Sequence, residues 1–246
     1  MKAGFLTDRG RRRKNNEDYI KIIDDIGLYL LADGVGGSRS GEVASEETVE
    51  SFANYIKLRI GDVQEEFDII GLLEEAMNFV NKKIHALSRD KKENIGMATT
   101  FVYALIKDGT SYIGNVGDSR AYLIHNKEII QITDDHTYVN ELLKAGLLTK
   151  EEAKKHTKKN IITRAIGAEE VVKADLFTFP IDLGDKMILC SDGLYDEISD
   201  DDILNIINKH DDMQMCAKEL IETANNCGGN DNISTICIKI MEEEHE

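Results

Sequence analysis

Four short acidic signatures are spread from end to end of this chain of 246 residues, and together they have the composition of one metal site. They are Asn16-Glu17-Asp18, Asp33-Gly34, Asp192-Gly193 and Asp231-Asn232, and a fifth, Gly117-Asp118-Ser119-Arg120, lies between them. Carboxylate oxygens are the ligands that Mg²⁺ and Mn²⁺ prefer in proteins. Residues this far apart can share a cation only if the fold gathers them. The pattern therefore predicts a fold in which both ends and the middle of the chain converge.

The two Asp-Gly pairs at 33–34 and 192–193 each follow an apolar, strand-like run. An Asp-Gly pair is commonly a turn, and Asp108-Gly109 between two strand-like runs is predicted to be one. Asp33-Gly34 instead leads into Val35-Gly36-Gly37 and then a helix. A carboxylate at a strand end is firmly held, and glycine lets its own carbonyl approach a cation closely. Both pairs are therefore predicted to bind metal.

The two acidic signatures nearest the chain ends are less specific on their own. Asp231-Asn232 opens the last predicted strand, where an ordinary turn is an equally good interpretation. Glu17 and Asp18 come just before a strand, in which neighbouring side chains point to opposite faces. We therefore expect these two carboxylates to have different roles.

The order of the predicted elements favours an α+β fold over a doubly wound sheet, because strands outnumber helices and are mostly antiparallel. The run 28–32 is apolar on both faces, which indicates two sheets packed face to face with helices outside each. The strands after residue 98 are predicted to form an antiparallel meander. The predicted strands are 3–7, 19–23, 28–32, 99–107, 111–116, 120–125, 128–132, 173–179, 186–190 and 233–240. The predicted helices are 49–60, 69–87, 201–208 and 213–225.

The organisation of the chain into domains stays open on composition alone. One proline and the lack of a linker-like stretch allow one large domain or two small ones. The segment 134–167 is polar and lysine-rich and is predicted to be an insertion lying over the surface of the sheet. The acidic residues 242–246 are predicted to be a frayed tail.

Charge and cysteine content exclude several classes of function. A net charge of −16 disfavours binding to nucleic acid or to anionic membranes. No signal-peptide pattern or membrane-length apolar run is seen, so a cytoplasmic location is expected. None of the four cysteines is followed six residues later by arginine, which excludes a phosphate-cradling cysteine loop, and buried reduced thiols are expected. The absence of a G-x-x-x-x-G-K-[ST] loop disfavours a nucleotide-binding enzyme.

Taken together, the motifs resemble those of the metal-dependent Ser/Thr protein phosphatase family (type 2C), in its bacterial branch. The similarity covers almost the whole chain, in the order and spacing of the family. Besides the acidic signatures, it includes Thr7-Asp8-Arg9-Gly10, Gly41-Glu42-Val43-Ala44-Ser45, Thr99-Thr100, Thr133-Asp134-Asp135-His136 and Ser191-Asp192-Gly193-Leu194.

This resemblance implies a four-layer α-β-β-α sandwich of two antiparallel sheets, with one catalytic domain over 1–241 and a flap over 134–167. It also implies two Mn²⁺ or Mg²⁺ ions in the cleft between the sheets and a weaker third position. The positions that match the family's metal ligands are Glu17, Asp33, Gly34 (through its carbonyl), Asp118, Asp192, Asp196 and Asp231.

Individual roles follow from the same resemblance. Asp33 is expected to bridge both ions, with Asp192 and Asp231 on the first. Glu17 and the Gly34 carbonyl are expected on the second, and Asp118 with Asp196 at the third. Asp18 is expected to support the ligands, and Arg13 to bind the phosphate, since a guanidinium can grip two phosphate oxygens at once.

The implied activity is hydrolysis of phosphoserine and phosphothreonine on proteins by direct attack of a water that bridges the metals. The expected partners are phosphorylated proteins, including a bacterial-type Ser/Thr kinase and its substrates, and the expected state is a monomer. One departure is Val35, which stands where animal members carry a histidine proposed to protonate the leaving group, so a metal-bound water is our substitute. The alternatives are a non-catalytic phosphoprotein-binding module on the same fold, or a phosphatase dedicated to one regulator or to small phosphoesters.

Overall fold

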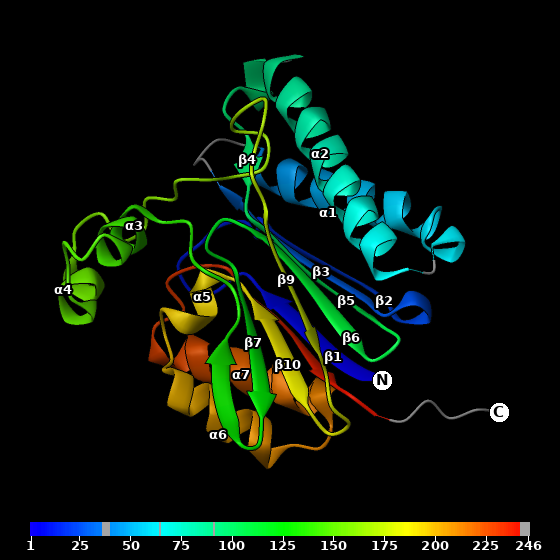
Figure 1. Cartoon of the computed structure of the whole chain (residues 1–246). Coiled ribbons are helices and arrows are strands. Elements are labelled where there is room, and N and C mark those ends of the chain that lie inside the picture. The colour runs from blue at the N-terminus through cyan, green and yellow to red at the C-terminus, as the bar shows by residue number, and fades with distance from the viewer. Residues whose placement is uncertain (36–39, 64, 91, 242–246) are drawn as a thin grey trace.

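Two antiparallel sheets stack face to face, and helices cover the outer side of each (Figure 1). The computed structural model describes residues 1–35, 40–63, 65–90 and 92–241. The predicted tail at 242–246 and the glycines at 36–37 lie outside the described residues. The arrangement confirms the predicted α-β-β-α sandwich.

The first sheet has the strand order β1-β11-β10-β7-β8, so the first and last strands of the chain are neighbours. Its strands are β1 (Lys2–Asp8), β7 (Arg120–His125), β8 (Glu128–Gln131), β10 (Lys186–Cys190) and β11 (Ile233–Lys239). The second sheet has the order β2-β3-β5-β6-β9, with β4 paired to β3. Its strands are β2 (Asp18–Ile23), β3 (Leu28–Val35), β4 (Ala98–Thr99), β5 (Phe101–Lys107), β6 (Thr110–Val116) and β9 (Asp175–Pro180).

The helices divide between the two outer layers. The second sheet is covered by α1 (Gly41–Lys57) and α2 (Glu66–Asp90), and the first sheet by α6 (Asp200–Lys209) and α7 (Met213–Cys227). The remaining helices are α3 (Tyr138–Lys144), α4 (Lys150–Lys155) and α5 (Asp192–Tyr195), with 3₁₀ turns at Asp24–Ile26, Ile60–Asp62 and Lys92–Asn94. Capping fixes several starts: Asp212, for example, accepts the backbone N–H groups of Gln214 and Met215 at the start of α7.

Three apolar layers hold these elements together. Phe52 and Tyr103 pack between the helices α1 and α2 and the second sheet. Tyr29 and Leu189 pack between the two sheets, which explains why both strands are apolar on two faces. Ile188 lies in the third layer, beneath α6 and α7.

The predicted meander is divided between the two sheets. Both two-residue turns have positive φ, 51° and 75° at Asp108-Gly109 and 50° and 66° at Asn126-Lys127, as tight hairpins require. However, β6 pairs with β5 and β9, while β7 pairs with β8 and β10. The chain crosses from one sheet to the other at residues 117–119. The prediction of a single continuous meander was therefore wrong.

Two other local predictions were also wrong. Asp33 does not follow the end of its strand, because β3 continues to Val35 by pairing Gly34 and Val35 with β4. The segment 134–167 does not lie over a sheet face, since Figure 1 shows α3 and α4 beside the sandwich. Only α3 and α4 are helical there, and irregular backbone makes up the rest.

The thiols mostly match expectation. Cys190, Cys216 and Cys237 are buried and reduced, whereas Cys227 is exposed because it lies in the last turn of α7. Within the described part of the chain, no helix combines the length and apolar character that crossing a bilayer requires.

The aromatic cluster under α1 should contribute strongly to stability. Phe52 is fully buried, with its ring centroid 5.0 Å from that of Phe101 and 4.6 Å from that of Tyr103. We expect Phe52→Ala to lower the free energy of unfolding by about 3–5 kcal/mol, measured by urea denaturation, because it leaves a cavity. The control is Phe67→Ala, which removes a side chain that is 82% exposed. It should change the free energy of unfolding by less than about 0.5 kcal/mol. Equal effects of the two substitutions would contradict this packing.

Candidate metal centre

Strand register places the acidic signatures at one end of the sandwich. In the first sheet, Cys190 pairs with both Arg120 and Thr235, so Asp118, Asp192 and Asp231 all lie just beyond the paired ends of their strands. In the second sheet, Asp18 pairs directly with Asp33. The fold therefore gathers the segments that the sequence separates.

Hydrogen bonds between the sheets close this end. The Ser191 hydroxyl donates to Asp18 Oδ2 at 2.9 Å, joining β10 to β2. The backbone N–H of Glu17 donates to Asn232 Oδ1, also at 2.9 Å. Glu17 and Asp18 thus have different surroundings, as their adjacent positions predicted.

The carboxylates at the centre repel one another and are buried. Burial and the charges of Asp18 and Asp192 raise the pKa of Asp33 well above its usual range. Burial and the charges of Asp118 and Asp231 likewise raise the pKa of Asp192 well above its usual range. Burial and the charge of a neighbouring carboxylate, Asp135, raise the pKa of Asp118 to about 7. Burial is the largest cause that raises the pKa of Asp18 to about 6, and the charge of Asp231 adds to it.

A second group of oxygens surrounds the start of α1. A Cβ built on Gly41 would collide with Glu17 Oε2 and would lie 3.2 Å from the Gly34 carbonyl oxygen. The Glu17 carboxylate and the Gly34 carbonyl are therefore close together, with only a glycine between them. These are the two groups that the resemblance placed on the second ion.

Two predicted residues are engaged in ion pairs at the edge of this centre. Arg13 Nη2 donates to Asp231 Oδ2 at 2.6 Å, which places the guanidinium beside the acidic centre. Asp196 Oδ2 accepts from Lys159 Nζ at 2.7 Å, so the segment 134–167 contacts the acid predicted for the third ion.

The donor set fits hard divalent cations. It consists of oxygen atoms alone, and Oδ1 of both Asp18 and Asp192 is buried with no hydrogen-bond partner among the described residues. Buried carboxylates that repel one another need a compensating cation to stay ionised. The acidic centre therefore has the composition of a site for hard divalent cations.

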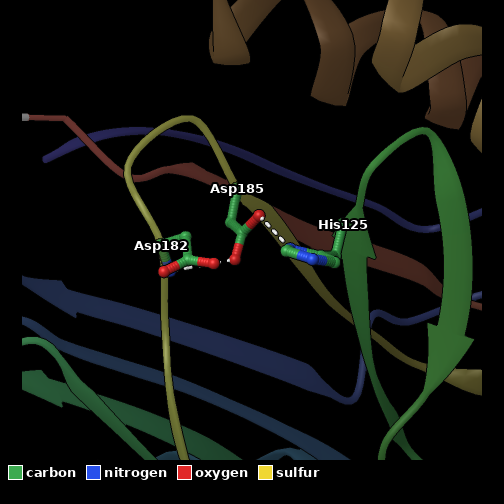
Figure 2. Close-up of side chains that lie close together, drawn as sticks. All are labelled: His125, Asp182 and Asp185. Atoms are coloured by element: carbon green, nitrogen blue, oxygen red, sulfur yellow. Dashed lines mark hydrogen bonds and ion pairs between the residues drawn. The ribbon is translucent and has the colours of Figure 1, made fainter.

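A tighter cluster lies at the far end of the first sheet. His125, Asp182 and Asp185 are the three side chains in the described part of the chain whose ligand atoms all lie within 4.8 Å of one another (Figure 2). His125 Nδ1 is 2.8 Å from Asp185 Oδ1, and the Asp182 N–H donates to Asp185 Oδ2 at 3.0 Å. These contacts satisfy both Asp185 oxygens, so ordinary turn hydrogen bonding accounts for the group.

Comparison with known proteins decides the family. The family model for protein phosphatase 2C matches residues 7–236. The chain belongs to the protein phosphatase 2C family. It is 38% identical over 242 residues to the serine/threonine phosphatase stp of Listeria monocytogenes, covering 97% of this chain and 96% of that one.

Solved structures agree with this membership of the 2C family. The Mycobacterium tuberculosis serine/threonine phosphatase PstP/Ppp is similar with a TM-score of 0.89 and 33% identity, covering 98% of this chain and 99% of that one. The catalytic domain of PstP in complex with two manganese ions is similar with a TM-score of 0.86 and 33% identity, covering 98% of each chain.

In this 2C phosphatase, a cavity of about 810 Å³ adjoins the acidic centre. Asp118, Asp192 and Asp196 line one part of it, and residues of the segment 134–167 line another.

Sequence reasoning gave no role to two residues of this centre, Glu42 and Asn232. Glu42 Oε2 is buried and has no hydrogen-bond partner among the described residues, and its charge acts on Glu17. Asn232 donates to the carbonyls of Arg9 and Asn15 at 2.9 and 2.8 Å. Both residues belong to motifs that the sequence shows, Glu42 to 41–45 and Asn232 to 231–232. Only the folded structure shows what each side chain contacts.

The proximity of Glu42 and Glu17 predicts a measurable electrostatic effect. Burial is the main cause that raises the pKa of Glu17, and repulsion by Glu42 is the next. Glu42→Gln removes that repulsion, so we expect the pKa of Glu17 to fall in the metal-free protein, measured by NMR titration. Glu46→Gln, an exposed change one turn along α1, should leave the pKa in place. An unchanged Glu17 pKa in the Glu42 variant would contradict the proximity.

Proposed function

We propose that this enzyme removes phosphate from phosphoserine and phosphothreonine on other proteins, with two Mn²⁺ or Mg²⁺ ions per site and a weaker third. The chain is a metal-dependent protein serine/threonine phosphatase of the 2C family. The observation that carries the proposal is the convergence of Asp33, Asp192 and Asp231 at one buried end of the sandwich, beside Arg13.

The proposed division of ligands is the one that the family resemblance implies, and the arrangement of the side chains supports it. Asp33 lies within electrostatic reach of Asp192 and Asp231, which supports it as the bridging ligand of two ions. Asp192 and Asp231 repel each other from the two neighbouring strand ends, which supports a shared first ion. The Glu17 carboxylate and the Gly34 carbonyl supply the second.

The remaining acids have supporting positions. Asp118 and Asp196 both lie near Asp192 on the cavity side, which supports a third, weaker ion there. Asp18 is held by Ser191 and lies opposite Asp33 in the strand register, so it fixes the position of β3 relative to β10.

Bound cations would polarise the phosphate and lower the pKa of a water molecule at this site. The chain's own contribution is to hold these charges in place and to orient the substrate. The Arg13 side chain is 53% exposed, so its guanidinium is accessible to a phosphate group of the substrate. Val35 has no proton to give, so no histidine-like proton donor follows the first Asp-Gly pair.

The substrates proposed are phosphorylated proteins, including a Ser/Thr kinase and its targets. We also propose that residues 1–241 form one catalytic domain in which 134–167 is the flap, because that segment borders the cavity. The monomeric state and the cytoplasmic location stay predictions.

Metal dependence provides the direct test of function. The purified enzyme should lose activity on a phosphothreonine peptide after EDTA treatment and regain it with Mn²⁺, because the buried carboxylates need cations. Mn²⁺ should also raise the melting temperature, since it binds the folded state. Asp192→Asn should abolish both effects, whereas the control Asp182→Asn, at the far end of the first sheet, should retain them. Full activity after exhaustive chelation would refute the proposal.

The role of Arg13 has a kinetic signature. We expect Arg13→Ala to raise KM by about 10- to 150-fold with a smaller change in kcat, because it removes a charge-assisted contact worth about 1.5–3 kcal/mol. Arg13→Lys keeps the charge but loses the planar guanidinium, so its KM should lie between that of the wild-type enzyme and that of Arg13→Ala. A loss of kcat at unchanged KM would place Arg13 in the chemical step instead.

A further inference from the structure

His136 belongs to a family motif to which the proposed mechanism gives no role. It lies at the start of the segment 134–167 and is 4% exposed. A buried histidine whose ring nitrogens both have hydrogen-bond partners fixes the positions of those partners relative to each other.

Two hydrogen bonds join His136 to Gly117. The backbone N–H of His136 donates to the Gly117 carbonyl at 2.9 Å, and the Gly117 N–H donates to His136 Nδ1 at 3.1 Å. Because Nδ1 accepts, the proton of the neutral ring is on Nε2, which donates to Asp175 Oδ2 at 3.0 Å. Burial, the largest cause, lowers the pKa of His136, which favours this neutral form.

The far side of the ring is anchored to the opposite end of the same segment. Arg164 Nη1 donates to Asp175 Oδ1 at 3.0 Å, so Asp175 receives both His136 and Arg164. The Thr163 N–H also donates to the His136 carbonyl at 2.7 Å. His136 thus connects the two ends of the segment 134–167 through its carbonyl and through Asp175, and its ring adds the contact with Gly117.

The residues after Gly117 are held by other parts of the fold. The Tyr195 hydroxyl donates to the Asp118 carbonyl at 2.9 Å, and Ser119 Oγ lies 2.7 Å from Thr100 Oγ1. Both partners lie outside the segment 134–167. The ring contact is therefore a direct link from that segment to the turn that presents Asp118.

We propose that His136 is a positioning residue: its Nδ1 fixes the Gly117 N–H and so sets where the Asp118 carboxylate points. This inference rests on the proposed function, in which Asp118 holds the weaker third ion. Both ring nitrogens have protein partners, Gly117 and Asp175, so the effect of the ring on the site passes through the Gly117–Asp118 turn.

Two isosteric substitutions separate the two sides of the ring. In His136→Asn, the side-chain oxygen occupies the place of Nδ1 and can accept the Gly117 N–H. In His136→Gln, the side-chain amide nitrogen occupies the place of Nε2 and can donate to Asp175, but Nδ1 is lost. We would measure kcat and KM on a phosphothreonine peptide, Mn²⁺ binding by calorimetry, and melting temperature for both.

We expect His136→Gln to weaken the weakest Mn²⁺ binding step and to lower kcat by about 10- to 100-fold at unchanged KM, with the tighter steps retained. His136→Asn should stay close to wild type in Mn²⁺ binding and in kcat. Equal losses in the two variants, or no loss in either, would overturn the inference. A wild-type enzyme without phosphopeptide activity would instead refute the proposed function, so the two failures are distinguishable.

Discussion

One buried side chain, Asn232, holds the catalytic end of the molecule together. The loop that carries Arg13 and Glu17 belongs to neither sheet, and the Asn232 amide makes three hydrogen bonds with it. The adjacent Ser191–Asp18 bond joins the two sheets at the same level. These contacts help to fix the position of Glu17 relative to the strand ends of the first sheet.

Stability and function are separated in space. The apolar layers fill the body of the sandwich, while the carboxylates that repel one another are confined to one end. Such a cluster opposes folding when no cation neutralises it, so the stability must come from elsewhere. The long buried strands and the aromatic contacts beneath α1 supply it. The strand ends in turn hold the carboxylates at separations that their mutual repulsion alone would increase.

Much of this architecture could be predicted from the sequence because local chemistry specified it. Apolar runs located the strands, Asp108-Gly109 located a hairpin, and the spacing of the acidic motifs identified the family. The sheet assignment of β7 and β8 could not be predicted, because a hairpin has the same pattern whichever sheet it joins. The role of Glu42 was also hidden, since an acid in the first turn of a helix is common and its burial beside Glu17 arises only in the folded chain. The proposed ligand roles themselves stay predictions.

The place of β11 has a consequence for how the enzyme is made. This strand lies between β1 and β10, and Asp231 lies two residues before it, although it is the last described strand along the chain. During synthesis, β1 emerges long before β11, the strand with which it pairs, and this pairing must wait until residues 233–239 have left the ribosome. A nascent chain therefore cannot assemble the acidic centre early, and a product truncated before residue 231 lacks both the strand between β1 and β10 and the Asp231 carboxylate. The acidic centre is thus complete only in chains that have been translated through β11.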